Sequence, residues 1–86
     1  MIIRYSKKYK KQYCKFNQSI QEKVERTIEK FIKNPFDKTI YNHPLKGLLK
    51  RQRSISVTGD IRIIFEEYEN YTLVLMLEVG THSQLY

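Results

Sequence analysis

The stretch that decides the fold is RSISVTGDIRIIFEEY, residues 53–68. Up to residue 58 its apolar side chains alternate with polar ones, which is the period of a half-buried strand. Gly59-Asp60 marks a turn, and over 61–68 the apolar residues at 61, 63 and 65 again share one face. The stretch therefore predicts two antiparallel strands, 53–58 and 61–68, joined by a tight turn.

Two more strands and two helices follow from the flanking sequence. The apolar run after Glu69-Asn70 predicts a strand over 71–79, and the weak alternation of 2–5 predicts a short first strand. Two helical segments separate the first strand from the hairpin. The expected order is β-α-α-β-β-β, an α+β domain with a helical hairpin on one face of a mainly antiparallel twisted sheet.

The two helices are read from apolar stripes at helical spacing. Ser6 is expected to cap the first helix, in which Tyr9, Tyr13 and Phe16 share a stripe. The second helix is expected over 19–33, before Asn34-Pro35. Residues 35–51 lack periodicity and predict a loop with room for a helical turn. The second helix is expected to bury Ile20, Val24, Ile28 (or Thr27), Phe31 and Ile32, with Glu22–Arg26 and Glu29–Lys33 spaced for ion pairs.

Length and composition predict one small soluble domain over residues 1–86. A content of 41% hydrophobic and 29% charged residues is typical of a folded chain and argues against disorder. No apolar run approaches the roughly 20 residues of a membrane span, so no membrane association is expected. The single cysteine, Cys14, excludes an internal disulfide and favours a cytoplasmic location, and we interpret it as structural.

The net charge of +7 predicts a polyanionic partner. One basic group lies in the first sixteen residues, and a second extends from Lys46 to Arg53. Solvated helix faces or an acidic protein partner would explain the same pattern. The candidate RNA contacts are Lys7, Lys8, Lys11, Lys46, Lys50, Arg51, Arg53 and Ser56.

Three motifs resemble a known family, the RelE/ParE superfamily of bacterial type II toxins, and its YafQ-like branch in particular. NHPLKG (42–47) is similar to the His-Pro-Leu-x-Gly loop of that branch, and 53–65 looks like the central hairpin of the superfamily. GTHSQLY (80–86) looks like its Gly-Thr-His-x-x-aromatic ending. The resemblance implies a ribosome-dependent mRNA endonuclease that cuts in the A site without metal or cofactor. It also implies a cognate antitoxin, the 70S ribosome, and mRNA and rRNA as partners.

The resemblance also implies a set of catalytic residues. His43 matches the loop histidine, Asp60 the hairpin aspartate, His82 the C-terminal histidine and Tyr86 the terminal aromatic residue. Arg62 aligns with the catalytic arginine of RelE relatives.

The chain departs from the family pattern at two positions. Ser56 stands where YafQ has a second hairpin histidine and RelE a lysine, and Ile61 replaces the tryptophan of YafQ. Ser56 can bind a phosphate, but its hydroxyl cannot replace imidazole as an acid.

The residues suit this chemistry on physical grounds. Metal-free RNA cleavage needs a base for the 2′-hydroxyl, an acid for the leaving 5′-oxygen, cations for the phosphorane and a surface for the splayed nucleotide. Imidazole serves as base or acid because its ordinary pKa is about 6.5. Guanidinium binds phosphate bidentately, and an aromatic ring stacks on a base. We assign the base to His43 or Asp60, the acid to His82, the phosphate contacts to Arg53 and Arg62, and the stacking surface to Tyr86; the acid and base could be exchanged.

Each residue also has a purely structural interpretation. His43 and Asp60 suit turns, His82 could bond a backbone carbonyl, and Arg62 could face solvent or pair with Glu66 or Glu78. Two other functions stay open for the whole chain. One is a ParE-like toxin that poisons gyrase without cutting RNA, and the other is a weakly catalytic toxin that acts mainly by binding its antitoxin.

Overall fold

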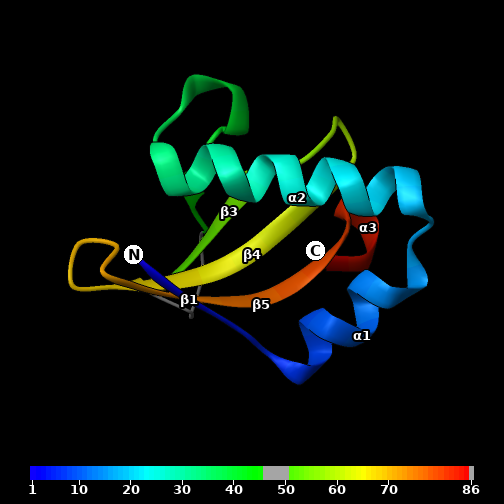
Figure 1. Ribbon diagram of the computed structural model, residues 1–86, viewed down its shortest axis with the longest axis horizontal. Coiled ribbons are helices and arrows are strands. Elements are labelled where there is room, and N and C mark those ends of the chain that lie inside the picture. The colour runs from blue at the N-terminus through cyan, green and yellow to red at the C-terminus, as the bar shows by residue number, and fades with distance from the viewer. Residues whose placement is uncertain (46–50, 86) are drawn as a thin grey trace.

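The computed structural model describes residues 1–45 and 51–85, and its centre is a twisted five-stranded sheet (Figure 1). The strand order is β1-β5-β4-β3-β2, with β1 parallel to β5 and the other neighbours antiparallel. The elements along the chain are β1 (Ile2–Tyr5), α1 (Lys7–Lys15), α2 (Gln18–Lys33), the 3-10 helix η1 (Lys38–Ile40), β2 (His43–Pro44), β3 (Gln52–Ser56), β4 (Ile61–Tyr68), β5 (Leu73–Thr81) and α3 (His82–Leu85).

The predicted order of strands and helices is confirmed, with two additions. The short strand β2 extends the sheet beyond β3, and the four-residue helix α3 follows β5. The third predicted strand lies at Leu73–Thr81 instead of 71–79, because Glu69, Asn70 and Tyr71 take left-handed backbone angles that lengthen the turn. The predicted helical turn in the loop is η1.

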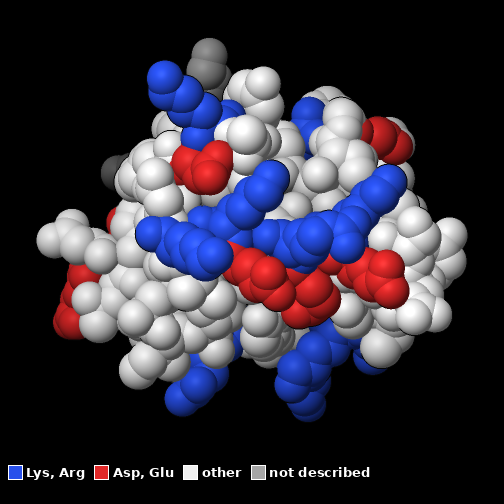
Figure 2. Space-filling model, turned by 45° about the horizontal axis from the view of Figure 1, so that its top comes forward, with Lys and Arg blue, Asp and Glu red and all other residues white. Residues whose placement is uncertain are grey.

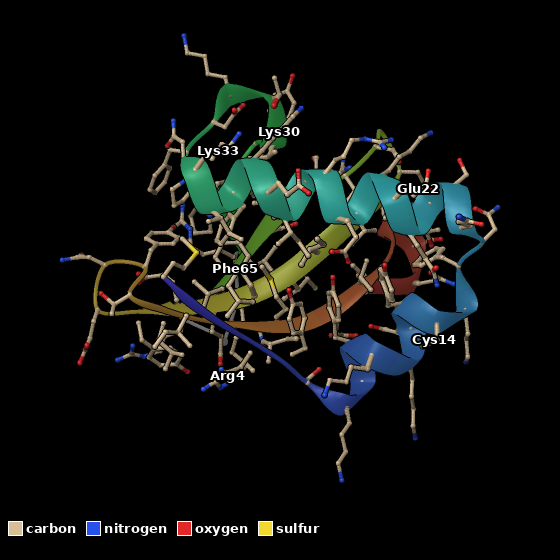
Figure 3. The ribbon with its side chains drawn as sticks, viewed as in Figure 1. Arg4, Cys14, Glu22, Lys30, Lys33 and Phe65 are labelled. Carbon is tan, nitrogen blue, oxygen red and sulfur yellow. The ribbon has the colours of Figure 1, made fainter. Side chains whose placement is uncertain are left out.

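The core lies between α2 and one face of the sheet. Phe31 of α2 meets Phe65 of β4 edge to face, with ring centroids 4.9 Å apart, and Figure 3 shows Phe65 beneath the helix. Ile61 and Ile63 share this face of β4, as the alternation predicted. One predicted core residue is wrong: Ile32 is half exposed, because at this spacing it falls beyond the stripe formed by Val24, Thr27, Ile28 and Phe31.

Ser6 joins α1 to the edge of β5. Its side-chain oxygen accepts a hydrogen bond from the backbone N–H of Tyr9 (2.9 Å), which caps α1 as predicted. The same hydroxyl donates to the carbonyl of Leu77 at 2.6 Å. Leu77 lies where the register between β4 and β5 shifts by one residue, so its carbonyl points toward α1 instead of toward β4. The Ser6 hydroxyl therefore provides a hydrogen-bond partner both for a backbone N–H at the start of α1 and for a backbone carbonyl at the bulge of β5.

We expect Ser6→Ala to lower the free energy of unfolding by about 2 kcal/mol, because it removes a helix cap and leaves a part-buried carbonyl without its donor. Urea unfolding followed by circular dichroism measures this change. Ser19→Ala, at an exposed position in the first turn of α2, is the matched control and should stay within about 0.5 kcal/mol of wild type. Equal urea midpoints for Ser6→Ala and wild type would contradict the assignment.

Candidate active site

An open pocket of about 590 Å³ lies between η1, β2 and the turn that joins β3 to β4. Two segments that are separate in sequence, 39–43 and 56–62, supply its lining. These residues are Thr39, Tyr41, His43, Ser56, Val57, Thr58, Gly59 and Arg62. The pocket thus combines an imidazole, a guanidinium, an aromatic ring and hydroxyl groups.

His43 is held by β2 and by a backbone carbonyl. Its Cα pairs with that of Ser54 on β3, and its Nδ1 lies 2.7 Å from the carbonyl oxygen of Tyr41. Because a carbonyl only accepts hydrogen bonds, Nδ1 carries the proton in the neutral ring. Nε2 is then the unprotonated nitrogen, and it can take a proton from a bound group.

Tyr41 is a site residue that the sequence analysis missed. Its backbone is left-handed, with φ 51° and ψ 50°, a conformation that is costly for a bulky residue and that clusters at functional sites. Its ring is 69% exposed beside the pocket, while its carbonyl orients His43. The available signal in the sequence was an aromatic residue two positions before a loop histidine.

Arg62 and Ser56 lie next to each other across the β3–β4 pair. Their Cα atoms are register partners, and on its other side Arg62 is opposite Gly80, which has no side chain. Nη1 of Arg62 donates to the carbonyl of Thr58 at 2.6 Å, so the guanidinium also braces the turn. Its Nη2 and Nε can still donate to an anion.

The acids proposed as partners for Arg62 have other contacts. Glu66 accepts a hydrogen bond from the hydroxyl of Tyr68 (3.0 Å), and Glu78 lies 2.9 Å from Nζ of Lys8. Within residues 1–45 and 51–85, Arg62 forms no ion pair, so the positive charge at the pocket is not neutralised by a carboxylate.

The C-terminal motif folds back on the end of β5. The side chain of Gln84 accepts from the backbone N–H of Thr81 (2.8 Å), and the hydroxyl of Thr81 accepts from the N–H of Gln84 (3.3 Å). This reciprocal pair is a capping box, and it starts α3 at His82. The Thr-x-x-Gln spacing was a readable signal for α3 that the sequence analysis did not use.

The capping box brings His82 to the hairpin turn. The backbone N–H of His82 donates to the carbonyl of Asp60 at 2.8 Å, and both residues are exposed. Thr58 and Gly59, which line the pocket, directly precede Asp60 in the chain. The structure therefore brings His43, Ser56 and Arg62 together in the pocket and places Asp60 with His82 at its neighbouring turn.

Gly80 makes this arrangement possible. A Cβ atom at this position would lie 2.9 Å from Oε1 of Gln84 and 3.3 Å from Cδ2 of Leu85. We expect Gly80→Ala to break the capping box, to cost about 1 kcal/mol of unfolding free energy and to shift the backbone resonances of α3 in two-dimensional NMR spectra. Gly59→Ala is the control, because a Cβ there meets nothing within 4 Å. Unchanged α3 resonances in Gly80→Ala would overturn this account.

The basic residues predicted to bind RNA are scattered, and Arg53 is not near Arg62. Strand alternation puts Arg53 on the opposite face from Ser56, where its Nε donates to Asn42 (2.8 Å) and its guanidinium lies 5.7 Å from the ring of Phe36. The pairing of Arg53 with Arg62 on one phosphate is therefore corrected. Arg51 packs on Tyr68 at 5.2 Å, at the far end of β4 from the pocket.

The other predicted contacts lie elsewhere or cannot be placed. Lys7, Lys8 and Lys11 are exposed on α1, which lies beside β5 on the opposite side of the sheet order from β3. Lys46, Lys50 and Tyr86 lie outside the described residues. Cys14 is exposed on α1.

No group of three or more histidine, cysteine, aspartate or glutamate side chains within the described residues could hold a metal ion. None of the helices described by the structure is long and apolar enough to cross a membrane.

This fold is that of the small RelE/ParE-type toxins. The structure is similar to that of YafQ from E. coli strain BL21(DE3), with a TM-score of 0.79 and 25% identity over 98% of this chain and 96% of that chain. YafQ in the E. coli DinJ–YafQ toxin–antitoxin complex gives a TM-score of 0.79 and 27% identity over 98% and 94%. The YoeB/ParE toxin from Agrobacterium tumefaciens shares the fold, with a TM-score of 0.79, 18% identity and coverage of 95% and 99%.

Sequence comparison assigns the particular family. The family model described as the YafQ bacterial toxin of the type II toxin–antitoxin system matches residues 1–86. The chain belongs to this family, and the resemblance found in its motifs is confirmed. A comparison with curated proteins gave no match.

Proposed function

We propose that this toxin is a ribosome-dependent endoribonuclease that cuts mRNA in the A site and acts in the cytoplasm. The observation that carries the proposal is the pocket itself. It pairs an imidazole whose Nε2 can accept a proton with an arginine that no carboxylate neutralises within the described residues. Membership of the YafQ family supports the same activity.

The proposed reaction is transesterification at the phosphodiester. Nε2 of His43 takes the proton of the 2′-hydroxyl, and the 2′-oxygen then forms a bond to phosphorus. The bond from phosphorus to the 5′-oxygen breaks, and His82 gives that oxygen a proton. The products are a 2′,3′-cyclic phosphate and a 5′-hydroxyl, and no oxidant, metal or cofactor enters the balance.

Other pocket residues hold the substrate. Arg62 donates from Nη2 and Nε to the phosphate as charge builds on it, and Ser56 offers a hydroxyl from the same side of the sheet. The exposed ring of Tyr41 provides a stacking surface for the splayed base, a role that the sequence assigned to Tyr86. Asp60 accepts a hydrogen bond from the backbone N–H of His82 through its carbonyl, and so holds the start of α3, which carries the acid.

A cognate antitoxin is the proposed protein partner. The E. coli YafQ relative occurs in a complex with DinJ, and the family is defined by toxin–antitoxin systems. The charge of +7 favours an acidic partner as well as RNA.

The test uses purified toxin and a 5′-labelled mRNA, either naked or bound to ribosomes with an empty A site. We expect cuts only on the ribosome, within the A-site codon, and upstream fragments that end in a cyclic phosphate. A gyrase supercoiling assay runs in parallel. Intact mRNA together with gyrase inhibition would reject the nuclease in favour of the ParE-like function.

A further inference from the structure

The exposed side of α2 carries its cations in a single row, which we call the α2 basic row. Its members are spaced three, four and three residues apart, so they follow one side of the helix. A second row, of acids, lies directly beside it, and Figure 2 shows a band of blue side chains with red ones along one side. The basic row is Lys23, Arg26, Lys30 and Lys33, and the acids are Glu22, Glu25 and Glu29.

The cations of the α2 basic row are not paired with these acids. The spacing predicted ion pairs between Glu22 and Arg26 and between Glu29 and Lys33, but in the described part of the chain no carboxylate lies within 4.0 Å of the row. Glu22 instead accepts from the side chain of Gln18 (3.3 Å). Burial, and then a hydrogen bond to Glu25, raise the pKa of Tyr13, so Glu25 faces α1. Glu25 thus faces α1, none of the three acids pairs with the basic row, and the charge of the row stays available.

The α2 basic row leads to the pocket. Nζ of Lys30 donates to the hydroxyl of Thr39 (3.4 Å), and Thr39 is part of the pocket lining. Figure 3 shows Lys30 and Lys33 at the end of α2 that is next to the segment with η1. From Lys23 to Lys33 the row is about 15 Å long at 1.5 Å per residue, so it can follow several successive phosphates.

Asp37, an acid at this junction, is already engaged in hydrogen bonds. Asp37 accepts both the hydroxyl (2.6 Å) and the backbone N–H (2.8 Å) of Thr39. These hydrogen bonds, and then the charge of Lys30, lower the pKa of this carboxyl. Asp37 therefore caps η1 and reduces the positive field only at that end of the row.

We propose that the α2 basic row binds the phosphate backbone of RNA beyond the phosphate held in the pocket. The inference rests on the proposed nuclease function and names the path of its substrate. Evenly spaced exposed cations without an apolar side chain among them suit phosphates. They suit a protein partner less, because the centres of protein interfaces are depleted in lysine and rich in aromatic anchors.

Three cations beside β5 that are not among the predicted RNA contacts provide a matched control. Arg4 on β1 and Lys10 and Lys15 on α1 are exposed, far along the sheet order from the pocket. Changing these three to glutamine removes the same charge as Lys23→Gln/Arg26→Gln/Lys30→Gln. Glutamine is a good helix former, so both triple variants should fold, and urea unfolding checks this.

The experiment measures toxin binding to mRNA-programmed ribosomes over a salt series. The α2 variant should bind at least about tenfold more weakly at low salt, and its slope of log K against log salt should fall by about 2, at roughly 0.7 for each lost contact. The control variant Arg4→Gln/Lys10→Gln/Lys15→Gln should keep the wild-type slope. Empty ribosomes and a short single-stranded mRNA, tested separately, show whether the row contacts rRNA or mRNA, and a loss on either supports the inference.

The outcomes separate this inference from the proposed function. If wild type cuts programmed mRNA but the two triple variants bind alike, the α2 basic row is not an RNA path and the nuclease proposal stands. If the α2 variant keeps RNA binding but loses its antitoxin, the row is a protein interface and the inference is wrong. If the wild-type toxin cuts no mRNA on programmed ribosomes, the nuclease proposal is rejected, whatever the two triple variants show. The single variant Lys30→Gln, with an expected slope change of about 0.7, repeats the test with minimal alteration.

Discussion

His43→Ala is expected to lower the rate of A-site mRNA cleavage by about 10²- to 10⁴-fold, the usual contribution of a general base. The reason is geometric. The carbonyl of Tyr41 fixes the proton on Nδ1 and leaves Nε2 to accept the 2′-hydroxyl proton in the pocket. The measurement is single-turnover cleavage on ribosomes with saturating toxin, so that a change in binding does not enter the rate.

A second variant separates catalysis from positioning. His43→Asn keeps a side-chain N–H that can donate to the carbonyl of Tyr41, but it has no group that accepts a proton at neutral pH. We expect it to be as slow as His43→Ala. Recovery of wild-type rate in His43→Asn would show that His43 only shapes the loop.

His82→Ala is expected to reduce single-turnover cleavage by a similar factor, about 10²- to 10⁴-fold, because the leaving 5′-oxygen loses its proton donor. The free energy of unfolding should change by less than about 1 kcal/mol. The side chain is exposed, and the bond to Asp60 uses the backbone N–H, which alanine retains.

The neighbouring residue provides the control for His82. Ser83 is also exposed on α3, and Ser83→Ala should cut mRNA at nearly the wild-type rate. The double variant His43→Ala/His82→Ala should be little slower than either single variant, since residues that act on one step are not additive. Full activity in His82→Ala would remove this residue from the mechanism.

The sequence was sufficient for the elements that follow a local period. The alternation of 61–68 and the stripe of Val24, Ile28 and Phe31 depend only on each residue's own neighbours, and both are confirmed. The two short elements were missed. β2 has two residues and forms only through pairing with β3, whereas α3 depends on a capping box whose space is provided by Gly80.

The sequence named most residues of the candidate site but not how they are arranged in space. Strand alternation already put Ser56 and Ile55 on opposite faces, which implied that Arg53 could not join Ser56 and Arg62. The many lysines of the first helix made it the expected RNA-binding surface. The sequence could not show that Lys8 pairs with Glu78, or that Glu22 and Glu29 form no ion pair with the cations of α2 in the described part of the chain.

The sequence by itself determined the strands, the helices, the apolar face of each and the family to which the chain belongs, because periodicity and short motifs are local properties. The tertiary structure alone decided which polar groups meet. His43 reaches the hairpin through β2, His82 meets Asp60 through α3, and Lys30 meets the pocket through η1. Each of these contacts joins segments that are separate in the chain, so it depends on how the core orders the elements in space.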